Sequence, residues 1–128
     1  MKFSLVFRVS AEDIDEWGHV NNVAYLRWVQ NVAVAHWRHA ATEEQREKFT
    51  WVVTRHEIDY KKPAFENDEI TSTTWVCEGK RATCERFTEI ARGEEILVKA
   101  RSIWCIIDRE TSRPTRISSA LRELFHMS

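Results

Sequence analysis

The segment that most constrains the fold is a long helix with no broad polar face. Residues 22–39 have the apolar spacing of one helix, and Asn21 or Asn22 can cap its start. Its apolar side chains cover most of the circumference: Val23, Ala24, Tyr25, Leu26, Trp28, Val29, Val32, Ala33, Val34, Ala35 and Trp37. A helix that is apolar on nearly every side is buried. We therefore expect a curved sheet wrapped around it.

The other segments have the patterns of strands. Residues 2–10 alternate between apolar and polar side chains, as in a half-buried strand. After a polar connection over residues 42–49, four further strands are predicted: 51–62, 69–78, 81–91 and 94–107. The first of these four is expected to place five side chains on one face: Val52, Thr54, His56, Ile58 and Tyr60. Strands joined by tight turns pair antiparallel. The prediction is an α+β fold, an antiparallel five-stranded sheet around one long central helix.

Composition excludes several classes of protein. The length of 128 residues fits a single domain over residues 1–128, and the net charge of −1 gives no field that recruits nucleic acid or an acidic membrane. Three cysteines without Cys-x-x-Cys spacing predict free thiols, and hence a cytoplasmic protein, rather than disulfides or a zinc site. No signal peptide or membrane-spanning stretch is expected.

An acidic segment connects the first strand to the central helix. It reads Asp13-Ile14-Asp15-Glu16-Trp17-Gly18-His19-Val20-Asn21-Asn22-Val23-Ala24-Tyr25. A helix N-terminus offers unpaired N–H donors, which can stabilise the oxyanion formed when a carbonyl is attacked. A nearby carboxylate can act as nucleophile or general base, so the pattern favours acyl transfer to water. Asp15 alone is equally compatible with a turn or capping residue.

The pattern Asp-x-Asp-x-x-Gly-His-Val-Asn-Asn-x-x-Tyr resembles hotdog-fold acyl-CoA thioesterases of the 4-hydroxybenzoyl-CoA thioesterase-like family. Its His-Val-Asn-Asn part is also similar to plant acyl-carrier-protein thioesterases. Two further segments resemble that family: Tyr60-Lys61-Lys62-Pro63-Ala64 followed by Asp68, and Asp108 followed by Arg113-Pro114. The resemblance implies a hotdog fold, assembly into homodimers or homotetramers, and no metal or redox cofactor.

The same resemblance implies roles for individual residues. Asp15 takes the place of the catalytic aspartate, the Asn22 backbone N–H that of the donor to the thioester carbonyl, and His19 that of an assisting histidine. The predicted substrate-binding residues are Trp17, Gly18, Asn21 and Tyr25. Two of these have a structural alternative, because the Asn21 side chain suits a helix cap and Tyr25 suits core packing. Trp17 departs from the family pattern, in which a small residue is common.

The expected function is hydrolysis of an acyl-CoA or acyl-carrier-protein thioester. Two alternatives remain open: a hydratase or dehydratase of acyl thioesters, and a non-catalytic acyl-CoA binding module. We expect a homodimer or homotetramer, because an open sheet edge invites pairing, and no nucleic-acid or membrane partner. Scattered basic residues could meet CoA phosphates: Arg55, Lys61, Lys62, Lys80, Arg81 and Arg92. Acyl chain length and carrier are left open.

Overall fold

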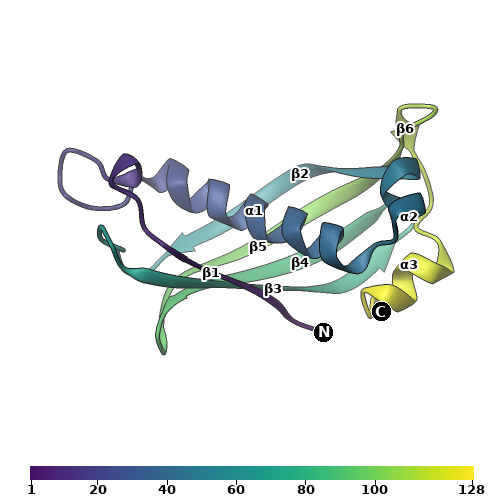
Figure 1. Cartoon of the computed structure of the whole chain (residues 1–128). Coiled ribbons are helices and arrows are strands. Elements are labelled where there is room, and N and C mark those ends of the chain that lie inside the picture. The colour runs from purple at the N-terminus through teal and green to yellow at the C-terminus, as the bar shows by residue number, and fades with distance from the viewer.

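A curved antiparallel sheet wraps around one long helix in the computed structural model, which describes all residues 1–128 (Figure 1). The elements follow in the order β1 (Phe3–Arg8), a 3₁₀ turn (Ala11–Asp13), α1 (Asn22–Ala40), α2 (Glu43–Lys48), β2 (Phe49–Tyr60), β3 (Glu69–Lys80), β4 (Thr83–Arg92), β5 (Glu95–Asp108), β6 (Arg113–Pro114) and α3 (Ser119–Leu124). The strand order is β1-β3-β4-β5-β2, and the two-residue β6 pairs with β5. The predicted α+β architecture is confirmed, with β6 in addition to the five predicted strands.

Helix α1 begins where the sequence predicts. Asn21 is its N-cap, and its side chain accepts a hydrogen bond from the Val23 N–H at 2.9 Å. One face of α1 is buried against the sheet: Ala24, Tyr25, Trp28, Val29, Val32, Ala33 and His36. The opposite face is less covered than predicted, because Val23 is 65% exposed and Val34 is 39% exposed. In a single chain the sheet therefore encloses only part of the helix.

Strand β2 departs from the predicted alternation. The register with β5 shifts between Val53 and Arg55, which marks a bulge at Thr54. Because a bulge adds one residue to the strand, side chains an even number of positions apart lie on opposite faces of the sheet when the bulge is between them. Val52 is consequently 46% exposed, whereas His56 and Ile58 are half-buried. The prediction that these side chains share one face is wrong for the first half of the strand.

Turn positions agree in part with the sequence. A turn at residues 66–67 lies between the predicted strands 51–62 and 69–78, with Asn67 in the left-handed region at φ 68°. The turn between β3 and β4 lies at residues 81–82, two residues later than predicted, and contains Arg81 at φ 47°. Ser118 caps α3 by accepting from the Leu121 N–H at 3.2 Å. None of the helices is long and apolar enough to cross a bilayer.

The core consists of two clusters along α1. The first surrounds the N-terminal half of the helix and includes Tyr25, Trp28 and the fully buried Ala64. The second surrounds the C-terminal half and brings Ala33 together with Trp104 on β5 and Phe125 after α3. All three cysteines are free thiols. The first cluster supports the acidic loop, and the second borders a cavity at the far end of the helix.

Candidate active site

The acidic segment folds into a small closed loop that projects beyond the N-terminal end of α1 (Figure 1). An isolated bridge pairs Ile14 with Val20. Within the loop, the Asp15 N–H donates to the His19 carbonyl at 2.8 Å, and the Gly18 N–H donates to the Asp15 carbonyl at 3.1 Å. Gly18 has φ +81°, a conformation that glycine adopts without a steric penalty. Backbone bonds therefore determine the shape of the loop.

The Asp15 carboxylate lies at the base of this loop and is half-buried. Its Oδ1 accepts hydrogen bonds from the Trp17 N–H at 2.9 Å and the His19 N–H at 3.2 Å. This is the turn-forming role that the sequence also allowed. Both bonds go to one oxygen, so Oδ2 has no protein donor. The side chain can hold the loop and still present an acceptor to water or substrate.

The loop returns directly to the start of α1. The Asn21 N–H donates to the Asp13 carbonyl at 2.8 Å, which places the strand-side end of the loop against the helix cap. Asn22 is exposed, and its N–H has no acceptor within the protein. A free N–H at a helix N-terminus is a donor for an anionic oxygen. The fold thus places the loop that carries Asp15 directly before the start of α1.

The other predicted site residues occupy different environments. His19 is exposed, and its ring packs edge-on against Phe65 with a centroid distance of 5.4 Å. Trp17 is 77% exposed at the tip of the loop. Tyr25 is 3% exposed, and its hydroxyl accepts a hydrogen bond from the Ala64 N–H at 2.7 Å. Burial raises the pKa of Tyr25, so it is a neutral phenol. This environment supports the packing role of Tyr25.

Asp13 has a structural role. Its carboxylate forms an ion pair with Arg27, one turn into α1. The contact links the approach to the loop with the exposed side of the helix. Asp13 and Asp15 are therefore distinct: one carboxylate is paired with a cation, and the other is bound only by backbone N–H groups.

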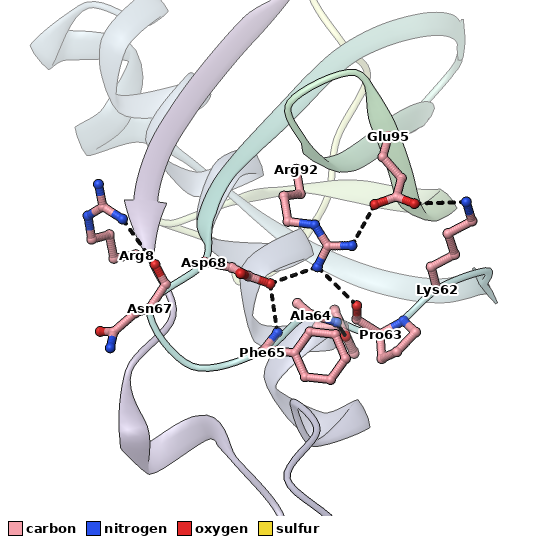
Figure 2. Close-up of polar contacts among 10 residues, drawn as sticks. Arg8, Lys62, Pro63, Ala64, Phe65, Asn67, Asp68, Arg92 and Glu95 are labelled. Atoms are coloured by element: carbon pink, nitrogen blue, oxygen red, sulfur yellow. Dashed lines mark hydrogen bonds and ion pairs between the residues drawn. The ribbon is translucent and has the colours of Figure 1, made fainter.

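A polar network that the sequence did not reveal joins residues 62–68 to Arg92 and Glu95 (Figure 2). Arg92 donates from Nη1 to Asp68 Oδ2 at 2.7 Å and to the Pro63 carbonyl at 3.3 Å, and from Nη2 to Glu95 Oε1 at 2.5 Å. Glu95 also accepts from Lys62 at 2.8 Å. The only member of this network that the sequence indicates is Asp68, which follows the Tyr60-Lys61-Lys62-Pro63-Ala64 segment. Arg92 and Lys62, considered for CoA phosphates, are engaged in ion pairs.

This network fixes residues 63–65, which contact the acidic loop through His19 and Val20. Burial disfavours the Asp68 carboxylate, but hydrogen bonds from Arg92 and from the Phe65 N–H outweigh it and lower the pKa of Asp68. The Arg92 guanidinium also lies 5.9 Å from the ring of Phe65, the ring that His19 contacts. The neighbouring Ala64 carbonyl accepts from the Val20 N–H at 3.0 Å. Asp68 and Arg92 thereby position Ala64 and Phe65, the two residues that contact Val20 and His19.

Three other ionisable side chains lie outside this site: Glu57, His56 and Cys84. Glu57 pairs with Arg55 and Arg101 on the sheet, while His56 bonds inward to Ser102 at 2.6 Å. Burial raises the pKa of the Cys84 thiol to about 11, which makes it a poor nucleophile. The structure contains no group of three or more His, Cys, Asp or Glu side chains that could hold a metal ion.

The sheet wrapped around one helix, with an acidic loop at the helix N-terminus, defines the hotdog class of thioesterase domains. Residues 1–125 match the family described as acyl-ACP thioesterase N-terminal domain, and the chain belongs to that family. It is 32% identical over 75 residues to a chloroplastic acyl-[acyl-carrier-protein] hydrolase, FATB3, of Cuphea viscosissima. That match covers 57% of this chain and 18% of the plant protein, so the chain spans a minor part of its relative.

Solved structures confirm the hotdog fold. A probable thioesterase from Bartonella henselae is 26% identical with a TM-score of 0.79, over 91% of this chain and 98% of that one. A thioesterase complexed with coenzyme A and Zn from Thermus thermophilus is 22% identical with a TM-score of 0.83, over 96% and 90%. A predicted thioesterase from Bacillus stearothermophilus has a TM-score of 0.89 at 20% identity, over 98% and 95%. The hotdog prediction is confirmed.

Proposed function

We propose that this domain hydrolyses an acyl thioester to a free acid and a thiol. The observation that carries the proposal is the Asp15 carboxylate, which has an unoccupied oxygen at the loop that leads into α1. As a general base, Asp15 takes a proton from water while the water oxygen attacks the thioester carbonyl carbon. Alternatively, Asp15 attacks that carbon itself, and water then hydrolyses the mixed anhydride.

The Asn22 N–H is the proposed oxyanion donor. The carbonyl oxygen gains negative charge when the tetrahedral intermediate forms, and a fixed backbone N–H stabilises that charge. When the intermediate collapses, the C–S bond breaks and the thiolate takes up a proton. His19, whose backbone contacts Asp15, is exposed and free to position water or deliver that proton. Gly18 and Asn21 contribute backbone to the substrate contact.

The proposed substrate is an acyl group carried by coenzyme A or by an acyl carrier protein. The family description and the name of the Cuphea relative support the acyl carrier protein. The Thermus structure contains coenzyme A, which supports the other carrier. Membership of the 4-hydroxybenzoyl-CoA thioesterase-like group, and Trp17 as an acyl contact, are retained as parts of this proposal. Tyr25, which is 3% exposed, is assigned to packing instead.

We also propose that the domain acts as a homodimer or homotetramer. Strand β2 is an edge of the sheet with no neighbour on its outer side. It carries two apolar side chains that are each 46% exposed, Val52 and Tyr60. Exposed Val23 and Val34 on α1 extend the uncovered apolar surface. Pairing of two β2 edges would satisfy their backbone groups.

Thiol release from a panel of acyl-CoAs and acyl-carrier-protein thioesters tests the proposal. Asp15→Asn keeps an Oδ1 acceptor for the Trp17 and His19 N–H groups, so the loop should stay folded. Loss of the carboxylate should lower kcat/KM by about 10²–10⁴-fold, the range for a general base. Glu16→Gln, an exposed neighbour in the same loop, is the matched control and should retain activity.

Three results would contradict the proposal. Full activity of Asp15→Asn would remove this carboxylate from the mechanism. Hydration of an enoyl-CoA without thiol release would identify a hydratase. Thermal stabilisation by acyl-CoA without turnover of any thioester would identify a binding module.

A further inference from the structure

A cavity of about 610 Å³ lies at the end of α1 opposite the acidic loop. It is enclosed by the C-terminal half of α1, by α2, by the start of β2 and by the segment that follows α3. Aromatic side chains form much of its wall, namely Trp37, Phe49, Trp51, Trp104 and Phe125. None of the residues proposed for thioester hydrolysis lines it. The cavity is therefore a separate feature of the fold.

A buried arginine lies in the wall of this cavity. Arg86 on β4 is 7% exposed. Its Nη1 donates to His36 Nδ1 at 3.0 Å and to Thr74 Oγ1 at 3.1 Å, whereas Nε and Nη2 have no protein acceptor. It pairs with no carboxylate, unlike the arginines that form ion pairs: Arg8, Arg27, Arg55, Arg92 and Arg101. A buried cation without a counter-ion is costly.

His36 does not balance this charge. Burial and the neighbouring Arg86 lower the pKa of His36 to about 4, so the ring is neutral at pH 7. Its Nδ1 accepts the hydrogen bond from Arg86, and its ring is stacked on Phe3 at 5.1 Å and edge-on to Phe125 at 5.0 Å. The histidine orients the guanidinium and leaves its positive charge in place.

Two further donors in the same wall also lack partners. The protein has three buried side-chain nitrogen or oxygen atoms without a hydrogen bond: Arg46 Nε, Ser72 Oγ and Trp104 Nε1. Arg46 and Trp104 both line the cavity, and Trp104 is only 8% exposed. Buried polar groups in folded proteins are normally satisfied. The cavity wall also includes charged side chains, among them Glu43 and Glu47, but neither forms an ion pair with Arg86. Unsatisfied donors gathered around one cavity indicate a ligand that supplies acceptors.

We propose that this cavity binds an apolar chain or ring that bears a carboxylate. The carboxylate accepts hydrogen bonds from the free Nε and Nη2 of Arg86, for which the planar guanidinium is suited. The apolar part of the ligand contacts the tryptophans that form the wall. The ligand is either a free carboxylic acid or the far end of an acyl group that carries a second carboxylate. This inference concerns binding and stands independently of hydrolysis.

Binding of decanoate, compared with neutral decan-1-ol, tests the proposal. Both are titrated below the concentration at which decanoate forms micelles, with tryptophan fluorescence and thermal stabilisation as readouts. The natural protein should bind decanoate at least 10-fold more tightly than decan-1-ol. Arg86→Met should abolish this preference, Arg86→Lys should retain part of it, and the exposed Arg116→Met should leave it unchanged. Melting without ligand verifies that each variant is folded.

Equal affinity of the natural protein for decanoate and decan-1-ol would overturn the proposal, as would undiminished decanoate binding by folded Arg86→Met. Thiol release then separates the two sources of carboxylate. Since His36 lies about 21 Å along α1 from Asn22 at 1.5 Å per residue, the acyl group must be long. For the end of such an acyl group, Arg86→Met raises KM for ω-carboxyoctadecanoyl-CoA about 10-fold more than KM for octadecanoyl-CoA. For a free acid, the variant loses decanoate binding and treats both thioesters alike. If the protein proves to have no thioesterase activity, the comparison of decanoate with decan-1-ol still tests the binding proposal.

Discussion

The hydroxyl of Tyr25 provides the sharpest test of how the acidic loop is held. It is the acceptor for the Ala64 N–H at 2.7 Å, and Ala64 is fully buried. Tyr25→Phe keeps the ring contacts with Trp28 and Tyr60, at centroid distances of 5.1 and 5.7 Å, and removes only this acceptor. The substitution therefore leaves one backbone N–H buried without a partner.

The expected cost follows from that single atom. A buried donor that loses its partner costs about 1–3 kcal/mol, because its desolvation is no longer offset. For a chain of this size each kcal/mol lowers Tm by about 3–5 °C, between the values for smaller and larger domains. Since the Ala64 carbonyl also accepts from Val20, the loosened backbone lies next to the acidic loop. We expect a smaller loss of thioesterase kcat/KM alongside the loss of stability.

Urea unfolding at fixed protein concentration measures the free energy of unfolding of Tyr25→Phe. Tyr60→Phe is the matched control, because Tyr60 is 46% exposed and its hydroxyl has no hydrogen bond. The control should lie within about 0.5 kcal/mol of the natural protein, as surface substitutions do. Equal free energies of unfolding for the two variants would refute the role assigned to the Tyr25 hydroxyl.

Three further predictions concern charge and assembly. The pKa of His36 is lowered from 6.5 to about 4, so the unfolded chain binds more protons than the folded protein between these pH values. The free energy of unfolding should therefore fall by up to about 3 kcal/mol as pH decreases through this window. In urea unfolding, His36→Gln should remove most of this pH dependence. The pKa of Asp68 is lowered, so its contribution is present above about pH 4 and is lost as pH falls further. Asp68→Asn should therefore be less stable than the natural protein at pH 7, and the difference should shrink as pH falls below about 4. Val52→Lys on the exposed edge of β2 should shift the assembly towards monomer in light scattering, with unchanged monomer helicity by circular dichroism.

The fold was predictable because two sequence periods differ strongly. The 3.6-residue pattern of residues 22–39 and the two-residue alternation elsewhere specify one helix and a set of antiparallel strands. The bulge at Thr54 was not predictable, since an extra residue in a strand leaves no composition signal in Val-Val-Thr-Arg. Its consequence is that Trp51 and His56, an odd number of positions apart, both face the interior.

The acidic loop was recognisable from Asp15 to Asn22 because its residues are contiguous in the sequence. The supporting network was not, because Asp68 and Arg92 are 24 residues apart and meet only when β3 and β4 have paired. The Arg86 cavity was hidden for the same reason. In the sequence, Arg86 has the pattern of a surface arginine on an alternating strand. Only the tertiary structure shows that His36 and Thr74 contact its guanidinium.

The acidic loop is closed by main-chain groups, and this has an evolutionary consequence. The Asp15 carboxylate is oriented by the amides of residues 17 and 19, which every amino acid except proline supplies. Side chains at positions 16 and 17 are thus free to vary while the acid stays in place, provided that glycine remains at 18. A lineage, or a protein engineer, could diversify the rim of this loop and sample new substrates without rebuilding its centre.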